Sequence, residues 1–311
     1  MDKMFLGIDG GGSQTTALIA GASVVIGRGR AGSSNYHAVG KDQALQAIQE
    51  AVAAALEQAG IAASSLSAAV LGLAGAGRST DRPIFETWAA AFLPAVPLKI
   101  TTDAGIVLEL CQGYPRLAVI CGTGAAVFGQ AAPEQPLQRA SGWGYLLGDE
   151  GSAFWIGRAA LGAVMRAADG RGGKTSLTNL ALDHYRVTTP EGLVKAVYDG
   201  VFVREQVAAF APQVDTAACA GDPAATRIIE QAGEELALAV KAVCDRMGGL
   251  EKAACILAGG VLLGSHAVCQ ALLRQVEHRG ITLQPLFLAS EPALGALKLA
   301  EQMVEIRKQA Q

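Results

Sequence analysis

Carboxylates and glycines gather in a few short segments of this 311-residue chain, each next to a stretch typical of a β-strand. In the first segment, Asp9 is followed by three glycines, Ser13 and Thr15. A carboxylate at the end of a buried strand can hold hydrated Mg²⁺, while glycine N–H groups approach phosphate oxygens. Glycine suits this turn because a Cβ would block that approach or the positive φ of the turn. The alternative interpretation is an ordinary tight hairpin.

A second glycine turn, Gly122-Thr123-Gly124, follows another apolar run more than a hundred residues later. Two such turns, each at the start of a similar β unit, predict a pair that clamps one phosphate chain from opposite sides. Gly259 and Gly260 end a further apolar run, where paired glycines let a flat ring lie against the backbone. Taken alone, this last pair is a weak signal.

Asp103 comes just after a short apolar strand and at the start of an apolar helix. It could simply cap that helix by accepting a free backbone N–H. However, open α/β sheets bind their ligands at the carboxyl ends of strands, so a general base is the second interpretation.

Residues 141–155 combine four glycines, Trp143 and the adjacent carboxylates Asp149 and Glu150, directly before an expected helix. Carboxylates that accept sugar hydroxyls beside an aromatic wall would explain this composition. The alternative is a capped helix entry with Trp143 in the core.

The elements around the first motif begin as a meander, with strands expected at residues 4–9, 15–20 and 23–29. No helix follows the glycines directly, which argues against a dinucleotide-binding fold or a P-loop. Helical spacing predicts helices at 41–59 and 80–92, and apolar runs predict strands at 67–73 and 98–101.

The pattern restarts after Pro115, with strands expected at 117–121, 125–129 and 137–141. A long helical region follows, and a strand-helix-strand-helix series ends the chain. The sequence therefore predicts two hairpin-led α/β units, the second enlarged by helices. The helices are expected at 150–168, 176–184, 190–198, 201–211, 222–247, 266–276 and from 292, and the strands at 253–257 and 282–285.

Composition narrows the possible partners. The chain is 51% hydrophobic with a net charge of −3 and no basic block, so nucleic acid and anionic membranes are not expected partners. Glycine, serine or threonine interrupts every charge-free stretch, and the start of the chain lacks a secretory pattern. We therefore expect a cytoplasmic protein. Its six cysteines include no Cys-x-x-Cys pair, which favours buried reduced thiols.

The order of these motifs over nearly the whole chain resembles the N-acetylglucosamine kinase family, of the BadF/BadG/BcrA/BcrD ATPase type. That family belongs to the superfamily of actin, hexokinases and heat-shock chaperone ATPases. The resemblance implies two ribonuclease-H-like domains of α/β class with an interdomain cleft that closes on ATP, Mg²⁺ and a sugar. The first would span residues 1–115, completed by 292–311, and the second residues 116–291.

The resemblance also implies roles for single residues. Asp103 matches the catalytic base, which would accept a proton from the sugar, and Asp9 matches the carboxylate associated with Mg²⁺. The implied sugar contacts are Asn35, Gly142, Trp143 and Asp149. The implied nucleotide contacts are Gly11, Gly12, Ser13 and Thr15 in the first phosphate loop, Gly122, Thr123 and Gly124 in the second, and Gly259 and Gly260 at the adenosine.

Three departures from the family pattern bear on the substrate. Ser13 stands where threonine is commoner, Ala125 where serine is frequent, and residues 73–77 replace a Ser-Gly-Gly type of segment near the sugar. The expected reaction is phosphorylation of the 6-hydroxyl of N-acetylglucosamine, with glucosamine or N-acetylmuramate as alternative substrates. Other readings are an ATPase that activates a partner enzyme and a sugar-sensing regulator. A homodimer is also expected.

Overall fold

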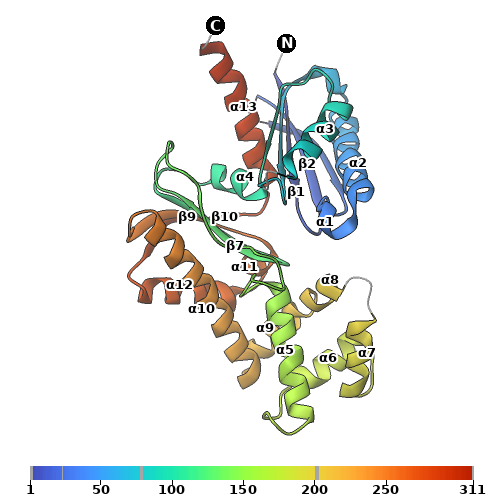
Figure 1. The fold of residues 1–311 in the computed structure, drawn as a ribbon, viewed down its shortest axis with the longest axis vertical. Helices are drawn as coiled ribbons and strands as arrows, with labels where there is room; N and C mark the ends of the chain where they lie inside the picture. Colours follow the sequence, from blue (N-terminus) through green and yellow to red (C-terminus); the bar gives the residue numbers. More distant parts are fainter. Residues whose placement is uncertain (1–2, 23, 78–79, 200–202, 310–311) are drawn as a thin grey trace. The chain divides into compact units, whose positions relative to one another are not determined.

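A computed structural model describes residues 3–22, 24–77, 80–199 and 203–309. The chain forms two compact units (Figure 1): unit 1 is Met1–Gln112 with Glu291–Gln311, and unit 2 is Gly113–Ser290. The expected domain limits, 1–115 with 292–311 and 116–291, lie close to these boundaries, and an interdomain cleft stays a prediction. Ser23 and Val201, where two expected elements begin, lie outside the described residues.

Unit 1 is built on a five-stranded sheet in the order β3-β2-β1-β4-β5. β1 pairs antiparallel with β2 and parallel with β4, and β5 continues the parallel part. Because β1, β4 and β5 run in one direction, their carboxyl ends meet at the same edge of the sheet. The strands are β1 (Met4–Gly10), β2 (Thr15–Gly21), β3 (Val24–Ala31), β4 (Leu66–Leu73) and β5 (Leu98–Thr101).

Helices cover both faces of this sheet, as Figure 1 shows for α2 and α13. Successive side chains of β1 enter two different cores, as the two-residue period of a strand requires. Leu6 and Ile8 pack with α2 and α3, whereas Phe5 packs with α4 and α13. The helical elements are α1 (Tyr36–Val39), α2 (Lys41–Ala59), η1 (Ala63–Ser65), α3 (Arg82–Phe92), α4 (Asp103–Leu110) and α13 (Ala293–Gln309).

Unit 2 repeats the same sheet plan in the order β10-β9-β6-β7-β8. Three antiparallel strands, β6 to β8, come first along the chain, and β9 and β10 then extend the sheet in parallel with β6. The expectation of two hairpin-led α/β units is confirmed. The strands are β6 (Arg116–Cys121), β7 (Ala125–Gln130), β8 (Gln138–Ser141), β9 (Lys252–Ala258) and β10 (Thr282–Ala289).

The helices of unit 2 share one large core with its sheet. Ile228, Leu236 and Val240 of the long helix α10 belong to the apolar stripe expected from the sequence, and all three are buried. The helices are α5 (Ala153–Ala168), α6 (Leu177–Tyr185), α7 (Pro190–Tyr198), α8 (Val203–Ala208), α9 (Ala211–Cys219), α10 (Pro223–Arg246), α11 (Gly260–Gly264) and α12 (His266–His278).

Two expected boundaries in unit 2 are wrong. The single helix expected at 201–211 ends early, and a second helix, α9, starts at Ala211 with Pro212 in its first turn, where the missing N–H costs nothing. Strand β10 continues past Pro285, where its register with β9 shifts because proline cannot donate to the ladder.

Two expectations about the chain's chemistry can be compared with the structure. Four of the six cysteines are buried, Cys269 is partly buried and Cys219 is exposed. In the described part of the chain, we find no helix with both the length and the apolar character needed to cross a bilayer.

Candidate active site

Asp9 and Asp103 lie at the carboxyl edge of the unit 1 sheet. Asp9 pairs with Gly72 of β4, and Gly72 pairs with Thr101 of β5, so these three residues form one row across the strands. Asp103 follows two residues after Thr101, at the start of α4. The sheet register therefore brings together two carboxylates that are 94 positions apart in the sequence.

Both carboxyl groups titrate above their usual range. Burial raises the pKa of Asp9 to about 7, and the negative charge of Asp103 contributes to this rise. Burial also raises the pKa of Asp103, although the backbone N–H of Ala104 opposes the effect by donating to its carboxylate. Two buried carboxyl groups with raised pKa, one of them raised in part by the charge of the other, are suited to bind a cation or a proton.

Asp103 is not the cap of its helix. Thr102 occupies the N-cap position, and its hydroxyl oxygen accepts the N–H of Gly105 at 3.0 Å. Asp103 is the first helical residue, and its Oδ1 accepts the adjacent Ala104 N–H at 2.9 Å. The N-cap position therefore belongs to Thr102 and not to Asp103, although the Asp103 carboxylate does accept one free N–H of the first turn. The role of Asp103 as a general base stays a prediction.

The first glycine turn has a different cause from the one expected. Gly10 and Gly11 do not have a positive φ. A Cβ on Gly10 would instead overlap the hydroxyl of Ser34, and it would lie 2.5 Å from the side chain of Leu73. The turn is closed by the Gly11 N–H, which donates to the Gln14 carbonyl at 3.0 Å. Close packing, rather than a left-handed backbone, requires glycine at position 10.

The other residues of this turn divide into two groups. Gly12 is partly exposed and Ser13 exposed, so both lie where a phosphate could approach. Thr15 is completely buried, and its hydroxyl donates to the Gly32 carbonyl at 2.8 Å. The Thr15 hydroxyl therefore holds the turn to the Gly32 segment, whereas a contact with the nucleotide was expected of it.

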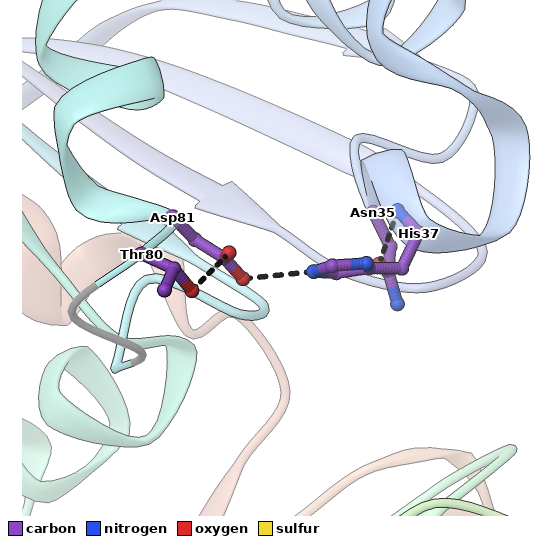
Figure 2. A network of polar contacts seen from close by, with 4 residues as sticks. All are labelled: Asn35, His37, Thr80 and Asp81. Atoms are coloured by element: carbon purple, nitrogen blue, oxygen red, sulfur yellow. Dashed lines mark hydrogen bonds and ion pairs between the residues drawn. The ribbon is translucent and has the colours of Figure 1, made fainter.

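Asn35 is held in place at the start of the short helix α1. Its side-chain oxygen accepts the His37 N–H at 3.2 Å, and its own N–H donates to Ser33 Oγ at 3.2 Å. Figure 2 shows that the His37 ring then extends to Asp81, with 2.8 Å between Nε2 and Oδ2. The expected sugar contact thus sits on a network that links two loops of unit 1.

Asp81 anchors that network. Burial alone would raise its pKa, but hydrogen bonds from His37, Tyr36 and Thr80 lower it to about 2. Thr80 Oγ1 donates to the second carboxylate oxygen at 2.9 Å (Figure 2). A Cβ on Gly75 would lie 3.6 Å from Asp81 Oδ2, so the network borders the 73–77 segment. Sequence reasoning missed both His37 and Asp81.

In unit 2, the Gly122-Thr123-Gly124 turn joins β6 to β7. The Gly122 N–H donates to the Gly124 carbonyl at 2.9 Å, which closes the turn. Behind it, the Gly122 carbonyl accepts the N–H of Ala153 at 2.9 Å, and the Thr123 carbonyl accepts that of Phe154 at 3.4 Å. The first turn of α5 therefore fixes the position of this loop.

Gly259 packs directly against the same turn. Its φ is +93°, and a Cβ there would overlap the Cys121 carbonyl and lie 2.9 Å from the Gly122 nitrogen. A Cβ on Gly122 would in turn lie 3.7 Å from the Gly260 nitrogen. The structure therefore brings together the second and the last glycine motifs of the sequence.

Trp143 lies on the surface and not in the core. Its side chain is 66% exposed, and the guanidinium of Arg139 lies 4.3 Å from its ring centroid. Gly142 and Gly144 on either side have φ values of +74° and +91°. The interpretation of Trp143 as a core residue is wrong, and an exposed aromatic ring stays available to a ligand.

Asp149, which was expected to contact the sugar, is buried. It is only 4% exposed, and its Oδ1 accepts the Gly144 N–H at 3.1 Å. A Cβ on Gly124 would lie 2.6 Å from its other carboxylate oxygen. Burial raises its pKa, although the Gly144 N–H and the Arg204 charge oppose this rise. Asp149 thus links the Trp143 loop to the glycine turn, and its contact with sugar stays a prediction.

Comparison with known proteins assigns the chain to a family. The sequence pattern of the BadF/BadG/BcrA/BcrD ATPase family matches residues 6–300. The chain belongs to this family. The matched range includes every predicted site residue of both units.

Several known proteins are similar to this chain along nearly their whole length. The N-acetylmuramic acid/N-acetylglucosamine kinase of Clostridium acetobutylicum is 32% identical, covering 96% of this chain and 98% of that protein. The N-acetyl-D-glucosamine kinase of Dictyostelium discoideum is 29% identical with the same coverage. A solved structure from Chromobacterium violaceum, a candidate N-acetylglucosamine kinase, has a TM-score of 0.76 at 28% identity and covers 96% of this chain and 99% of that one. The fold is that of the actin-like sugar kinases.

Proposed function

We propose that this protein is an ATP-dependent amino-sugar kinase that phosphorylates the 6-hydroxyl of N-acetylglucosamine, releasing N-acetylglucosamine 6-phosphate and ADP. The observation that carries the proposal is Asp103, a partly buried carboxylate at the first position of α4, where Thr102 is the N-cap, and close enough to Asp9 for its charge to raise the Asp9 pKa. A kinase of this type needs a base at the acceptor hydroxyl and groups that position the phosphates, without a covalent nucleophile.

Unit 1 supplies the base and one sugar contact in this proposal. Asn35 binds the sugar, and Asp103 accepts the proton of its 6-hydroxyl as the oxygen attacks the terminal phosphorus of ATP. The bond between that phosphorus and the bridging oxygen breaks, and ADP leaves with the electron pair. The raised pKa of Asp103 supports this role because a stronger base accepts the proton more readily.

Unit 2 supplies the nucleotide contacts and the remaining sugar contacts in this proposal. The Gly122-Thr123-Gly124 turn binds phosphate oxygens, and Gly259 with Gly260 lies against the adenosine. The close packing of these two glycine motifs supports the assignment, since both would touch one nucleotide. Gly142, Trp143 and Asp149 complete the sugar contacts, with the exposed Trp143 ring stacking on an apolar sugar face.

Mg²⁺ fits the acidic edge of unit 1. Among the described residues, no group of three or more His, Cys, Asp or Glu side chains forms a closed metal site. Mg²⁺ suits a more open arrangement, because it keeps several waters and binds through one or two carboxylates together with substrate phosphates. Asp9 would hold the ion, which when bound neutralises charge on the phosphates. Gly12 and Ser13 extend this edge toward the phosphate chain.

N-acetylmuramate is the second candidate substrate. The relative from Clostridium acetobutylicum acts on both N-acetylmuramic acid and N-acetylglucosamine by its name, and it matches nearly the whole chain. Residues 73–77 depart from the family pattern near the sugar, and this segment borders the Asp81 network. The departure favours a substrate whose substituent on that side differs from that of N-acetylglucosamine.

A coupled assay of ADP release tests the proposal over N-acetylglucosamine, glucosamine and N-acetylmuramate. We expect release that depends on both Mg²⁺ and an amino sugar, with N-acetylglucosamine giving the highest kcat/KM. Absence of sugar-dependent ADP release with all three substrates would contradict the kinase assignment. A higher kcat/KM for another of the three would replace the substrate and keep the enzyme class.

A further inference from the structure

Arg204 places a positive charge on the glycine turn of unit 2, although no sequence motif marks it. It is the second residue of α8, in the helical part of the unit. A Cβ on Gly124 would lie 3.0 Å from Arg204 Nη2, so the guanidinium lies in contact range of the turn. The same Nη2 is 3.8 Å from Asp149 Oδ2.

The guanidinium lacks a matching acceptor. Only 22% of the Arg204 side chain is exposed, and its buried Nε has no hydrogen-bond partner among the described residues. The 3.8 Å separation from Asp149 exceeds hydrogen-bond length, so the two groups attract each other without satisfying the N–H donors. Asp149 uses its other oxygen to accept the Gly144 N–H.

A mostly buried arginine with unused donors is costly unless something accepts its hydrogen bonds. The Tyr145 ring gives partial compensation, with its centroid 5.7 Å from the Arg204 Cζ. An anion at the turn would satisfy the guanidinium far better, because its planar fork matches two oxygens of a phosphate or carboxylate.

We propose that Arg204 is a nucleotide-binding residue that donates to phosphate oxygens of ATP and ADP at the Gly122-Thr123-Gly124 turn. This inference rests on the proposed function, which brings a nucleotide to the turn. It adds the one feature that a turn of glycine and threonine does not provide, which is a positive charge beside the phosphates. The Asp149 carboxylate holds the guanidinium near the turn in the absence of nucleotide.

The competing explanation is purely structural. Arg204 could serve only to balance the buried charge of Asp149, and its loss would then disturb the Trp143 loop and the glycine turn together. That explanation predicts weaker binding of every ligand of unit 2, charged or uncharged. It also predicts that removing the Asp149 charge restores ATP and ADP binding to a variant without Arg204.

The test uses the full chain and measures dissociation constants of ATP, ADP, adenosine and N-acetylglucosamine for the wild type, Arg204→Met and Arg204→Lys. Adenosine is measured by competition against ADP. Arg171→Met serves as the matched control, because Arg171 is an exposed arginine of unit 2 paired with Asp169. The double variant Arg204→Met with Asp149→Asn tests the structural explanation, and N-acetylglucosamine 6-phosphate tests whether the phosphate recognised belongs to the sugar product.

We expect Arg204→Met to weaken ATP and ADP by about 10- to 100-fold, the size of a charge-assisted hydrogen bond, while adenosine and N-acetylglucosamine change less than about 2-fold. The ATP and ADP dissociation constants of Arg204→Lys should fall between those of the wild type and Arg204→Met. The double variant should bind ATP and ADP as weakly as Arg204→Met. The inference would be overturned if adenosine binding weakened as much as ATP binding, or if the double variant regained ATP binding. It would also be overturned if Arg204→Met left ATP binding unchanged, or weakened only the binding of N-acetylglucosamine 6-phosphate. A wild type that binds no ATP would instead overturn the proposed function.

Discussion

The two units share one sheet plan but have different chemistry at the ends of their strands. Unit 1 places Asp9 and Asp103 at that edge. Burial raises the pKa of both carboxyl groups, and the charge of Asp103 adds to the rise at Asp9. Unit 2 places a glycine turn there, with Arg204 beside a buried Asp149. An acidic edge suits a metal ion and proton transfer, whereas a glycine turn with a guanidinium beside it suits phosphate. One topology thus supports two complementary tasks.

The glycines differ between the units as well. At the unit 1 turn, Gly10 is required because Ser34 and Leu73 leave no room for a side chain, and its φ is ordinary. In unit 2, Gly259 combines a φ of +93° with direct contact to the Cys121 carbonyl. Substitution in unit 2 should therefore disturb backbone geometry, while substitution at Gly10 should disturb side-chain packing.

The largest expected effect comes from the acidic edge. Asp103→Asn should lower kcat by about 10²- to 10⁴-fold, the usual contribution of a general base, while dissociation constants for ATP and sugar stay nearly constant. Because burial raises the Asp103 pKa, wild-type kcat should fall on the acid side at a pH above the ordinary 3.8 of aspartate. Steady-state kinetics over pH, combined with calorimetric binding, measure both. A variant with near-full turnover would remove Asp103 from this role.

A smaller effect is expected in the glycine turn of unit 2. Gly259→Ala introduces a Cβ next to the Gly122 nitrogen and forces a positive φ on alanine, at a cost of about 1–3 kcal/mol. Since the strain falls on the turn, ATP binding should weaken by about 10-fold and sugar binding less. Gly264→Ala is the control, because no atom lies within 4 Å of its added Cβ. Equal effects of the two substitutions would contradict the close packing described for Gly259.

The smallest expected effect concerns two aspartates with a pKa of about 2, Asp81 in unit 1 and Asp222 in unit 2, of which only Asp81 lies beside the proposed sugar site. Burial alone would raise the pKa of both carboxyl groups, but hydrogen bonds lower it by more than burial raises it. His37, Tyr36 and Thr80 donate to Asp81. Asp222 instead accepts from Ala225, Ser176 and Thr175. Because each folded-state pKa lies below the unfolded value, the stabilisation is complete above that value and is lost as pH falls toward 2.

Asp81→Asn and Asp222→Asn should each lower the free energy of unfolding at pH 7 by about 1–2 kcal/mol and reduce its loss in acid. Only Asp81→Asn should also raise KM for the sugar, by roughly 3- to 10-fold, because it releases His37 and so the Asn35 loop. Denaturant unfolding at pH 7 and pH 3, with sugar kinetics at pH 7, gives both quantities. A KM effect of equal size in the two variants would show that the Asp81 network does not position the sugar site.

Much of the fold could be predicted because its signals are local. Alternation in the first strand and glycines at its end define a hairpin, and a helical stripe defines α10 before any contact is known. The roles of single residues were harder to predict. Either Thr102 or Asp103 could accept a free N–H at the start of α4. Which of them is the N-cap depends on where the backbone becomes helical, and that residue is Asp103, so Thr102 is the N-cap.

The missed residues, His37, Asp81 and Arg204, share one property. Each acts through a partner distant in sequence, His37 and Asp81 through each other and Arg204 through Gly124 and Asp149. Nothing in the local pattern around any of them signals that partner. The Asp222 cluster shows the same limit, since its contacts with Thr175 and Ser176 depend on how two helices pack.

The central claim is that the acidic edge directs the phosphoryl group of ATP to a sugar hydroxyl instead of water. Phosphorus-31 and carbon-13 spectra of a reaction with ATP, Mg²⁺ and N-acetylglucosamine test it most directly. The account predicts one sugar phosphate ester at carbon 6 for each ADP formed. Formation of ADP with inorganic phosphate, at a rate independent of the sugar, would contradict it and identify an ATPase without a sugar acceptor.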